Sequence, residues 1–135
     1  MATDIRDGMT RLNRRLRQVR PLGELTQTQL SALMSLEFAG TLTPTELADV
    51  ERVQPPTMTK IVAKLESLGL VQRTPHPTDG RQSLLSATDH GREVFAAQSR
   101  AKDAWLTLRL AQLPDGDRET LHAAAELLRR LAREE

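Results

Sequence analysis

Apolar residues recur along most of the chain at the three- and four-residue spacing of an amphipathic helix. The apolar positions are Ile5, Met9, Leu12, Leu16 and Val19, then Leu30, Leu33, Met34 and Phe38, then Met58, Ile61, Val62, Leu65 and Leu68, then Val94, Phe95, Ala101, Trp105 and Leu108, and finally Leu121, Ala124, Leu128 and Leu131. The pattern predicts a mainly helical chain in which these residues form the apolar faces of the helices.

Three hydroxyl residues predict where helices begin. Thr26 is followed by Gln29, and Thr43 by Glu46, at the spacing at which a side-chain hydroxyl and a carboxylate or amide cap each other's backbone N–H groups. Thr88 is suited to cap a long helix further along the chain. We therefore expect helices to start directly after each of these threonines.

Proline and glycine mark the remaining boundaries. Pro44 suits the first turn of a short helix over 44–51, and Pro55 and Pro56 suit the first turn of the next helix. Helix ends are predicted at Pro21 and Gly23, at Gly40, at Gly69, and near Leu113 and Pro114.

One stretch of the chain has a different period. Residues 70–73 and 82–86 read as two short strands, joined by a turn over 75–80, and together they predict a hairpin with a basic tip. The predicted order is one helix, three short helices, the hairpin and two long helices. This is a mainly α fold of about six helices with one small hairpin.

The helix over 44–51 and the helix that follows it have the layout of a helix-turn-helix DNA reader. The outward positions of the second helix are Pro56, Thr59, Lys60 and Ala63, with Thr57 and Lys64 on one flank. Threonine hydrogen-bonds base edges, and lysine reaches guanine or phosphate oxygens. Taken alone, the segment also fits an ordinary solvated helix face.

The hairpin adds a second candidate DNA contact. Arg81 follows Asp79 and Gly80 on the turn, and an arginine at a hairpin tip fits a narrow minor groove. A carboxylate does not favour a phosphate, so we expect Asp79 to orient Arg81 or Arg73 through a bidentate pair.

Three short motifs follow one another at the predicted helix end, hairpin tip and helix start. They are Leu65-Glu66-Ser67-Leu68-Gly69-Leu70-Val71-Gln72-Arg73, then Asp79-Gly80-Arg81, then Ala87-Thr88-Asp89-His90-Gly91-Arg92. As a set they resemble the signature of the MarR (multiple antibiotic resistance regulator) family of winged helix-turn-helix transcription factors, and the likeness covers nearly the whole chain. The resemblance implies a dimer built from the first and last two helices. It also implies a repressor that responds to a small aromatic or phenolic effector.

These observations assign the chain to two regions and three sets of residues. Residues 1–22 and 89–135 are expected to form the dimerisation region, and residues 23–88 the winged helix-turn-helix. The expected DNA contacts are Thr43, Thr45, Gln54, Pro55, Pro56, Thr57, Thr59, Lys60, Lys64, Arg73, Asp79 and Arg81. The expected dimer contacts are Ile5, Met9, Leu121, Leu128 and Leu131. The expected walls of an effector pocket are Leu12, Arg15, Arg17, Phe38 and Trp105.

Charge changes this picture only locally, because the chain of 135 residues has a formal net charge of +1. Residues 1–20 have six arginines and two aspartates, which gives a charge of +4. Residues 21–50 have four carboxylates and no basic residue, which gives −4. Residues 51–81 have five basic and three acidic residues, which gives +2. Such basic segments are able to bind phosphates even in a nearly neutral chain.

Composition excludes several other functions. The chain has no cysteine, which excludes disulfides, thiolate metal sites and cysteine nucleophiles. His76, His90 and His122 lack metal-binding spacing and read as surface histidines, and no catalytic motif is present, so we expect neither an enzyme nor a bound cofactor. No apolar run approaches the roughly 20 residues needed to span a membrane, and residues 1–9 lack the apolar segment of a signal peptide. The expected location is the cytoplasm, at the nucleoid when the protein is bound to DNA.

A helical interaction adaptor or antirepressor that no longer reads DNA is the alternative function. It would use the same helical dimer without the basic face around Lys60 and without the arginine at the hairpin tip. Both of these features favour the DNA-binding regulator.

Overall fold

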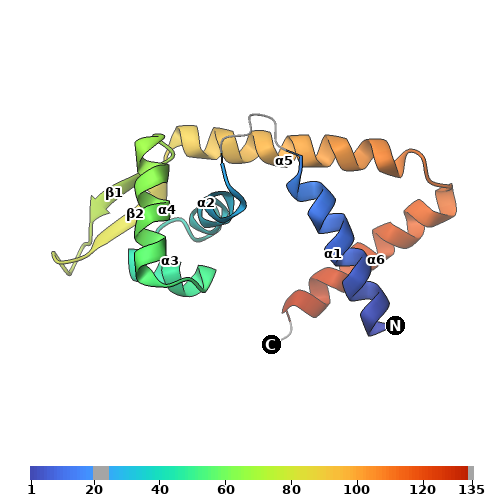
Figure 1. The fold of residues 1–135 in the computed structure, drawn as a ribbon, viewed down its shortest axis with the longest axis horizontal. Helices are drawn as coiled ribbons and strands as arrows, with labels where there is room; N and C mark the ends of the chain where they lie inside the picture. The colour runs from blue at the N-terminus through green and yellow to red at the C-terminus, as the bar shows by residue number, and fades with distance from the viewer. Residues whose placement is uncertain (20–24, 134–135) are drawn as a thin grey trace.

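The computed structural model describes residues 1–19 and 25–133. This part of the chain contains six helices and one two-stranded antiparallel sheet (Figure 1). The elements are α1 (Ala2–Arg17), α2 (Gln27–Ala39), α3 (Pro44–Glu51), α4 (Pro55–Ser67), β1 (Val71–Pro75), β2 (Ser83–Ala87), α5 (Asp89–Leu110) and α6 (Asp115–Arg133). The predicted mainly helical fold with one small hairpin is confirmed.

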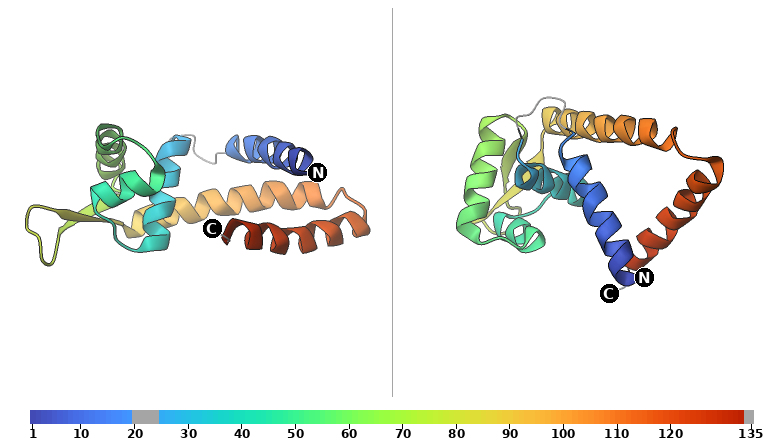
Figure 2. Two further views of the ribbon diagram at one scale, coloured as in Figure 1. Left: turned by 90° about the horizontal axis from the view of Figure 1, so that it is seen from below. Right: turned by 45° about the vertical axis from the view of Figure 1, so that its right-hand side comes forward.

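The elements gather at the two ends of the long helix α5. At its first end lie α2, α3, α4 and the hairpin, and at its other end lie α1 and α6, on either side of α5 when the molecule is seen from below (Figures 1 and 2). All buried apolar residues of the described chain fall between Leu25 and Ala87, whereas α1 and α6 have no buried residue. None of the described helices has both the length and the apolar character needed to cross a membrane.

The three predicted threonine caps are confirmed. Thr26 Oγ1 accepts from the backbone N–H of Gln29 at 3.2 Å, and the Gln29 side chain accepts from Thr26 N at 3.0 Å. Thr43 and Glu46 form the same reciprocal pair at 3.1 Å in both directions. Thr88 Oγ1 accepts from the third residue of α5 at 3.0 Å. Each cap satisfies backbone donors that the first turn of a helix leaves unpaired.

Glycine ends α2 and α4 as predicted. Gly40 and Gly69 have φ angles of 85° and 72°, which a residue with a side chain rarely adopts. After α4, Gly69 N donates to Glu66 O at 3.0 Å and Leu70 N donates to Leu65 O at 2.9 Å. This is the Schellman arrangement, and it turns the chain directly from α4 into β1.

The predicted apolar face of α2 is wrong at two positions. Met34 and Phe38 are 39% and 79% exposed, whereas Ala32, Leu33 and Leu36 are completely buried. The reason is that α3, α4, β2 and α5 all pack against α2, and the neighbours decide which side of the helix is covered. The spacing of apolar residues within one helix does not contain that information.

Other boundaries differ by a few residues. Both strands extend slightly beyond the predicted ends, to Pro75 in β1 and Ala87 in β2, and α5 ends at Leu110 rather than near Leu113. α1 ends at Arg17, and the helix end predicted at Pro21 and Gly23 lies outside the described residues.

A tight joint connects α4, the hairpin and α5. Thr88 Oγ1 donates to Gly69 O at 2.6 Å, and Thr88 N donates to Leu70 O at 3.0 Å. Gly91, one turn into α5, is packed so closely that a Cβ atom there would overlap the Leu70 carbonyl oxygen and lie 3.3 Å from the side chain of Leu33. Only glycine allows α5 to approach the base of the hairpin this closely.

We expect Gly91→Ala to lower the free energy of unfolding by about 1–3 kcal/mol, because the added methyl group meets rigid backbone. Urea denaturation at a fixed protein concentration measures this loss. Gly116→Ala on α6 is the matched control, since a Cβ atom there meets nothing within 4 Å. Equal urea midpoints for the two variants would contradict the tight joint.

Candidate nucleic-acid interface

α3 and α4 form a helix-turn-helix whose second helix is held outward. Leu47 of α3 and Met58 and Val62 of α4 are buried in the common core. The turn between the helices passes through Arg52, whose φ of 54° is in the left-handed region, and Val53 N closes it by donating to Ala48 O at 3.1 Å. Among the described residues, Arg52 is the only non-glycine with a positive φ.

The exposed face of α4 is the predicted one. Its residues are Gln54, Pro55, Pro56, Thr57, Thr59, Lys60, Ala63 and Lys64, and all of them are exposed. The Thr59 hydroxyl donates to Pro55 O at 3.0 Å, which leaves its oxygen free to accept. No described carboxylate lies within 4.0 Å of the ammonium of Lys60 or Lys64. The helix therefore offers two unpaired cations and several small side chains to an anionic partner.

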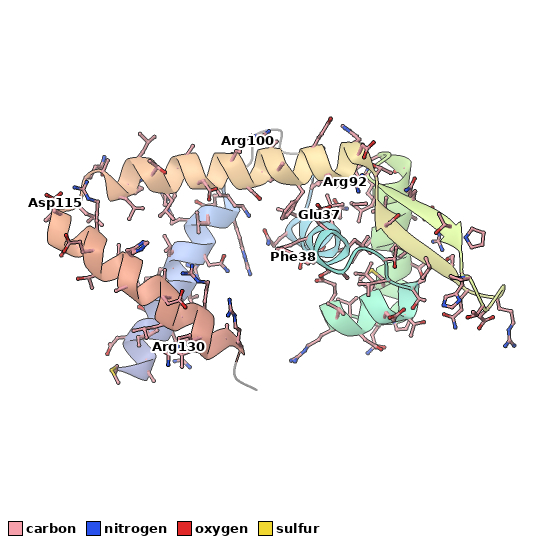
Figure 3. All side chains as sticks on the ribbon, turned by 180° about the vertical axis from the view of Figure 1, so that it is seen from behind. Glu37, Phe38, Arg92, Arg100, Asp115 and Arg130 are labelled. Carbon is pink, nitrogen blue, oxygen red and sulfur yellow. The ribbon has the colours of Figure 1, made fainter. Side chains whose placement is uncertain are left out.

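The hairpin places one arginine far out in solvent. The Arg81 side chain is 93% exposed, and the tip of the hairpin projects away from the rest of the molecule (Figure 3). Asp79 Oδ1 accepts from Arg81 N at 3.1 Å and from Arg81 Nε at 3.5 Å. Asp79 therefore orients Arg81, as expected, but mainly through its backbone. The expected bidentate pair is wrong, because only one guanidinium nitrogen is engaged.

Arg73 has different partners from the predicted Asp79. Its Nε donates to Glu66 Oε1 of α4 at 2.9 Å, and its Nη1 donates to Ser83 of β2 at 3.1 Å. The guanidinium therefore ties the hairpin to the last turn of α4. This bond joins the two elements that carry the candidate DNA contacts.

The two threonines at the start of α3 have different surroundings. Thr43 is buried, at 5% exposure, and its hydroxyl caps α3, whereas Thr45 is exposed. Hydrogen bonds from the backbone and side chain of Thr43 lower the pKa of Glu46, which partners it in the cap. Folding lowers this pKa, so the stability contributed by the cap is complete above the ordinary glutamate pKa and is lost as the pH falls through the lowered value.

The histidines do not form a metal site. In the described chain no group of three or more His, Asp or Glu side chains is arranged to hold a metal ion. His90 and His122 are exposed on α5 and α6, as predicted. His76 is half-buried in the hairpin turn, where Nδ1 accepts two backbone hydrogen bonds. This role of His76 is not predictable from the sequence, because Pro77 and Asp79 beside it signal only a turn.

The predicted effector residues do not share one cavity. Leu12 lines a cavity of about 440 Å³ between α1, α5 and α6. Phe38 lies edge-on to Phe95 with ring centroids 6.4 Å apart, and the guanidinium of Arg109 covers Trp105 at 4.9 Å. The other two predicted residues, Arg15 and Arg17, are exposed on α1.

A smaller cavity of about 200 Å³ lies between α2 and α5. Its lining residues are Gln27, Leu30, Ser31, Met34, Phe95, Gln98, Ser99 and Lys102. Gln98 is only 7% exposed, and its Oε1 has no hydrogen-bond partner among the described residues. A buried amide oxygen without a partner is costly, and a ligand with a donor group would satisfy it.

α1 and α6 carry the largest exposed apolar surface. All five predicted dimer contacts are exposed, from 37% for Leu128 to 64% for Leu131. Ile5 and Met9 of α1 line a hollow of about 510 Å³ together with Leu131 of α6.

Comparison with known proteins decides the family. The profile described as "MarR family" matches residues 25–83, which hold the helix-turn-helix and most of the hairpin. The HTH-type transcriptional regulator Mb0904 of Mycobacterium bovis is 44% identical over 128 residues, which is 95% of this chain and 90% of that protein. The chain belongs to the MarR family. A MarR-family chain is a DNA-binding winged helix-turn-helix transcriptional regulator and not an enzyme, so the non-DNA-binding adaptor is set aside.

Two further relatives support the assignment to the MarR family. A transcriptional regulator from Pseudomonas aeruginosa has a crystal structure that superposes with a TM-score of 0.88 at 31% identity, covering 99% of this chain and 94% of that one. The HTH-type transcriptional repressor MdtR of Bacillus subtilis is 32% identical over 108 residues, which is 80% of this chain and 68% of that protein.

Proposed function

We propose that this MarR-family regulator is a homodimeric, effector-responsive repressor that binds a pseudo-palindromic operator. One observation carries the proposal. The exposed face of α4 has two lysines without an ion-pair partner in the described chain, and the projecting tip of the wing formed by β1 and β2 has an exposed arginine. The name of MdtR supports the repressor role.

α4 is the proposed major-groove element. Thr57, Thr59, Lys60 and Lys64 are exposed on it, and their hydroxyl and ammonium groups match base edges and phosphates. Thr45, in the first turn of α3, is exposed as well. The buried Thr43 supports the helices and is not part of the proposed contact face.

The wing is the proposed minor-groove element. The Arg81 side chain is 93% exposed at the tip of the wing, and an arginine side chain is attracted by the enhanced negative potential of a narrow minor groove. Asp79 accepts from the backbone N–H of Arg81, and Arg73 links the wing to α4. Both residues therefore position Arg81 and are not proposed to contact DNA themselves.

Dimerisation is proposed to bury the apolar stripes of α1 and α6. A monomer would leave Ile5, Met9 and Leu131 in water, and contiguous apolar surface of this kind marks an interaction site. Residues 1–22 and 89–135 would then form the dimer, and residues 23–88 one reading head per subunit. Two heads related by a twofold axis meet half-sites about 34–36 Å apart.

The proposed effector site is the cavity between α2 and α5. The unpaired Gln98 Oε1 needs a hydrogen-bond donor, the Phe95 ring offers an aromatic face and the Lys102 ammonium attracts an anion, so the cavity suits a small phenolic carboxylate whose hydroxyl donates to Gln98. An effector acts by binding one arrangement of the reading heads better than another. A cavity between α2 and α5 is well placed for this, because α2 belongs to the reading head and α5 leads to the dimer region.

The Lys60→Glu and Lys64→Glu double variant is expected to bind operator DNA about a hundredfold more weakly or worse, because it replaces attraction to phosphates by repulsion. Fluorescence anisotropy measures this on a duplex that the wild-type protein selects from a random-sequence pool. Arg100→Glu, a charge reversal at an exposed residue of α5 outside the proposed effector cavity, is the control and keeps wild-type affinity. Unchanged affinity in the double variant would refute the proposed contact face.

Leu128→Asp is expected to raise the dimer dissociation constant about a hundredfold or more, since it buries an unpaired charge in the proposed interface. Sedimentation equilibrium checks this. Val50→Asp places the same charge at an apolar residue of α3 that is 57% exposed and outside that interface, so it should leave the dimer intact. The dimer surface is wrongly assigned if Leu128→Asp remains dimeric.

The phenolic acid 4-hydroxybenzoate is expected to change the fluorescence of Trp105, the only tryptophan, and to weaken operator binding. Uncharged 4-hydroxybenzamide, which keeps the hydroxyl donor, should do neither, and Lys102→Glu should lose both responses to 4-hydroxybenzoate, because the cation that attracts the carboxylate is gone. Equal responses to the acid and the amide would contradict the proposed recognition of an acid.

A further inference from the structure

The wing turn is organised around the imidazole of His76. Nδ1 accepts from the backbone N–H of Thr78 at 3.2 Å and from that of Asp79 at 3.1 Å. Pro77, between His76 and Thr78, has no N–H to satisfy. One ring nitrogen therefore holds both of the backbone donors that begin the turn.

This pattern requires a neutral ring. A nitrogen that accepts hydrogen bonds carries no proton, so the histidine proton must lie on Nε2. The geometry is that of a turn in which an Asn or Asp side chain accepts from the backbone N–H groups two and three residues ahead. Asparagine places Oδ1 where histidine places Nδ1.

The same turn holds Arg81 in place. The backbone N–H of Asp79 is fixed by His76, and its carboxylate accepts from Arg81 N at 3.1 Å and from Gln82 Nε2 at 3.3 Å. Gln82 N donates to Asp79 O at 3.1 Å, and His76 N donates to Gln82 O at 3.4 Å. These hydrogen bonds connect the imidazole of His76 to the backbone of Arg81 at the tip.

We propose that His76 is a positioning residue for DNA binding, in which its unprotonated Nδ1 holds the wing turn so that Arg81 enters the minor groove. Protonation of Nδ1 removes the acceptor and releases the turn, so acidification weakens operator binding. The inference rests on the proposed contact between Arg81 and DNA.

Two acidic residues act on the imidazole and enter its pH dependence. Glu46 of α3 interacts with it electrostatically, and Asp79 lies within the turn itself. Both carry negative charge at neutral pH and attract a protonated ring. Such attraction does not restore the two hydrogen bonds, because a protonated Nδ1 is a donor and faces two backbone donors.

The test compares His76→Ala with His76→Asn on the selected operator duplex at about pH 8. Loss of the acceptor in His76→Ala should weaken binding about fivefold to tenfold, whereas His76→Asn should keep wild-type affinity because its Oδ1 accepts the same bonds. Wild-type affinity in His76→Ala, or equal weakness in both variants, would overturn the proposal.

A pH profile gives a second readout that a merely structural side chain would not move. As the pH is lowered from about 8 to 6, wild-type binding should weaken relative to His76→Asn, which has no imidazole at this position. His90 and His122 remain in both proteins, so they cancel in the comparison. Parallel pH profiles would overturn the proposal.

Measurements without DNA separate this inference from the proposed function. Amide exchange at Thr78 and Asp79 should be slow in the wild type and in His76→Asn, and faster in His76→Ala; equal exchange in all three would overturn the role of His76. Weak operator binding by Arg81→Ala with full binding by His76→Ala would overturn it as well. Full binding by Arg81→Ala would refute the wing contact, and amide exchange would still decide the role of His76.

Discussion

Ala32, Leu33 and Leu36 of α2 have no solvent-exposed surface, because α3, α4, β2 and α5 all pack against this one helix. The burial of apolar surface is the dominant favourable contribution to folding, and the buried apolar residues of the described chain all lie between Leu25 and Ala87. The core therefore holds α4 and the wing in place. The exposed side chains of these two elements are not needed for the core and are available to contact a partner. The other end of the molecule has no such core of its own within one chain.

The local features of the fold were predictable from the sequence. Caps at Thr26, Thr43 and Thr88 and the glycine end at Gly69 depend on residues within one turn of each other, and all of them formed as expected. The outward face of α4 was also predictable, since its four apolar residues fix the buried side of a helix that packs on one side only.

Features that depend on distant neighbours were not predictable. Met34 and Phe38 fit the apolar spacing of α2, but the elements that pack on this helix cover another side of it. Arg73 pairs with Glu66 and not with the predicted Asp79, because the hairpin lies against the end of α4. The role of His76 depends on the path of the turn, since the same residue in an open loop would be an ordinary surface histidine.

The joint at Thr88 and Gly91 has a geometric consequence for how the two ends of the molecule communicate. α5 has 22 residues and is about 33 Å long at 1.5 Å per residue, and its first turn cannot shift against the base of the wing without a steric clash. A rotation of α5 therefore moves the wing together with the helix. A tilt of about 10° at the far end of α5 displaces the wing by about 6 Å, close to one turn of α-helix and more than the spacing of about 3.4 Å between successive nucleotides of one DNA strand.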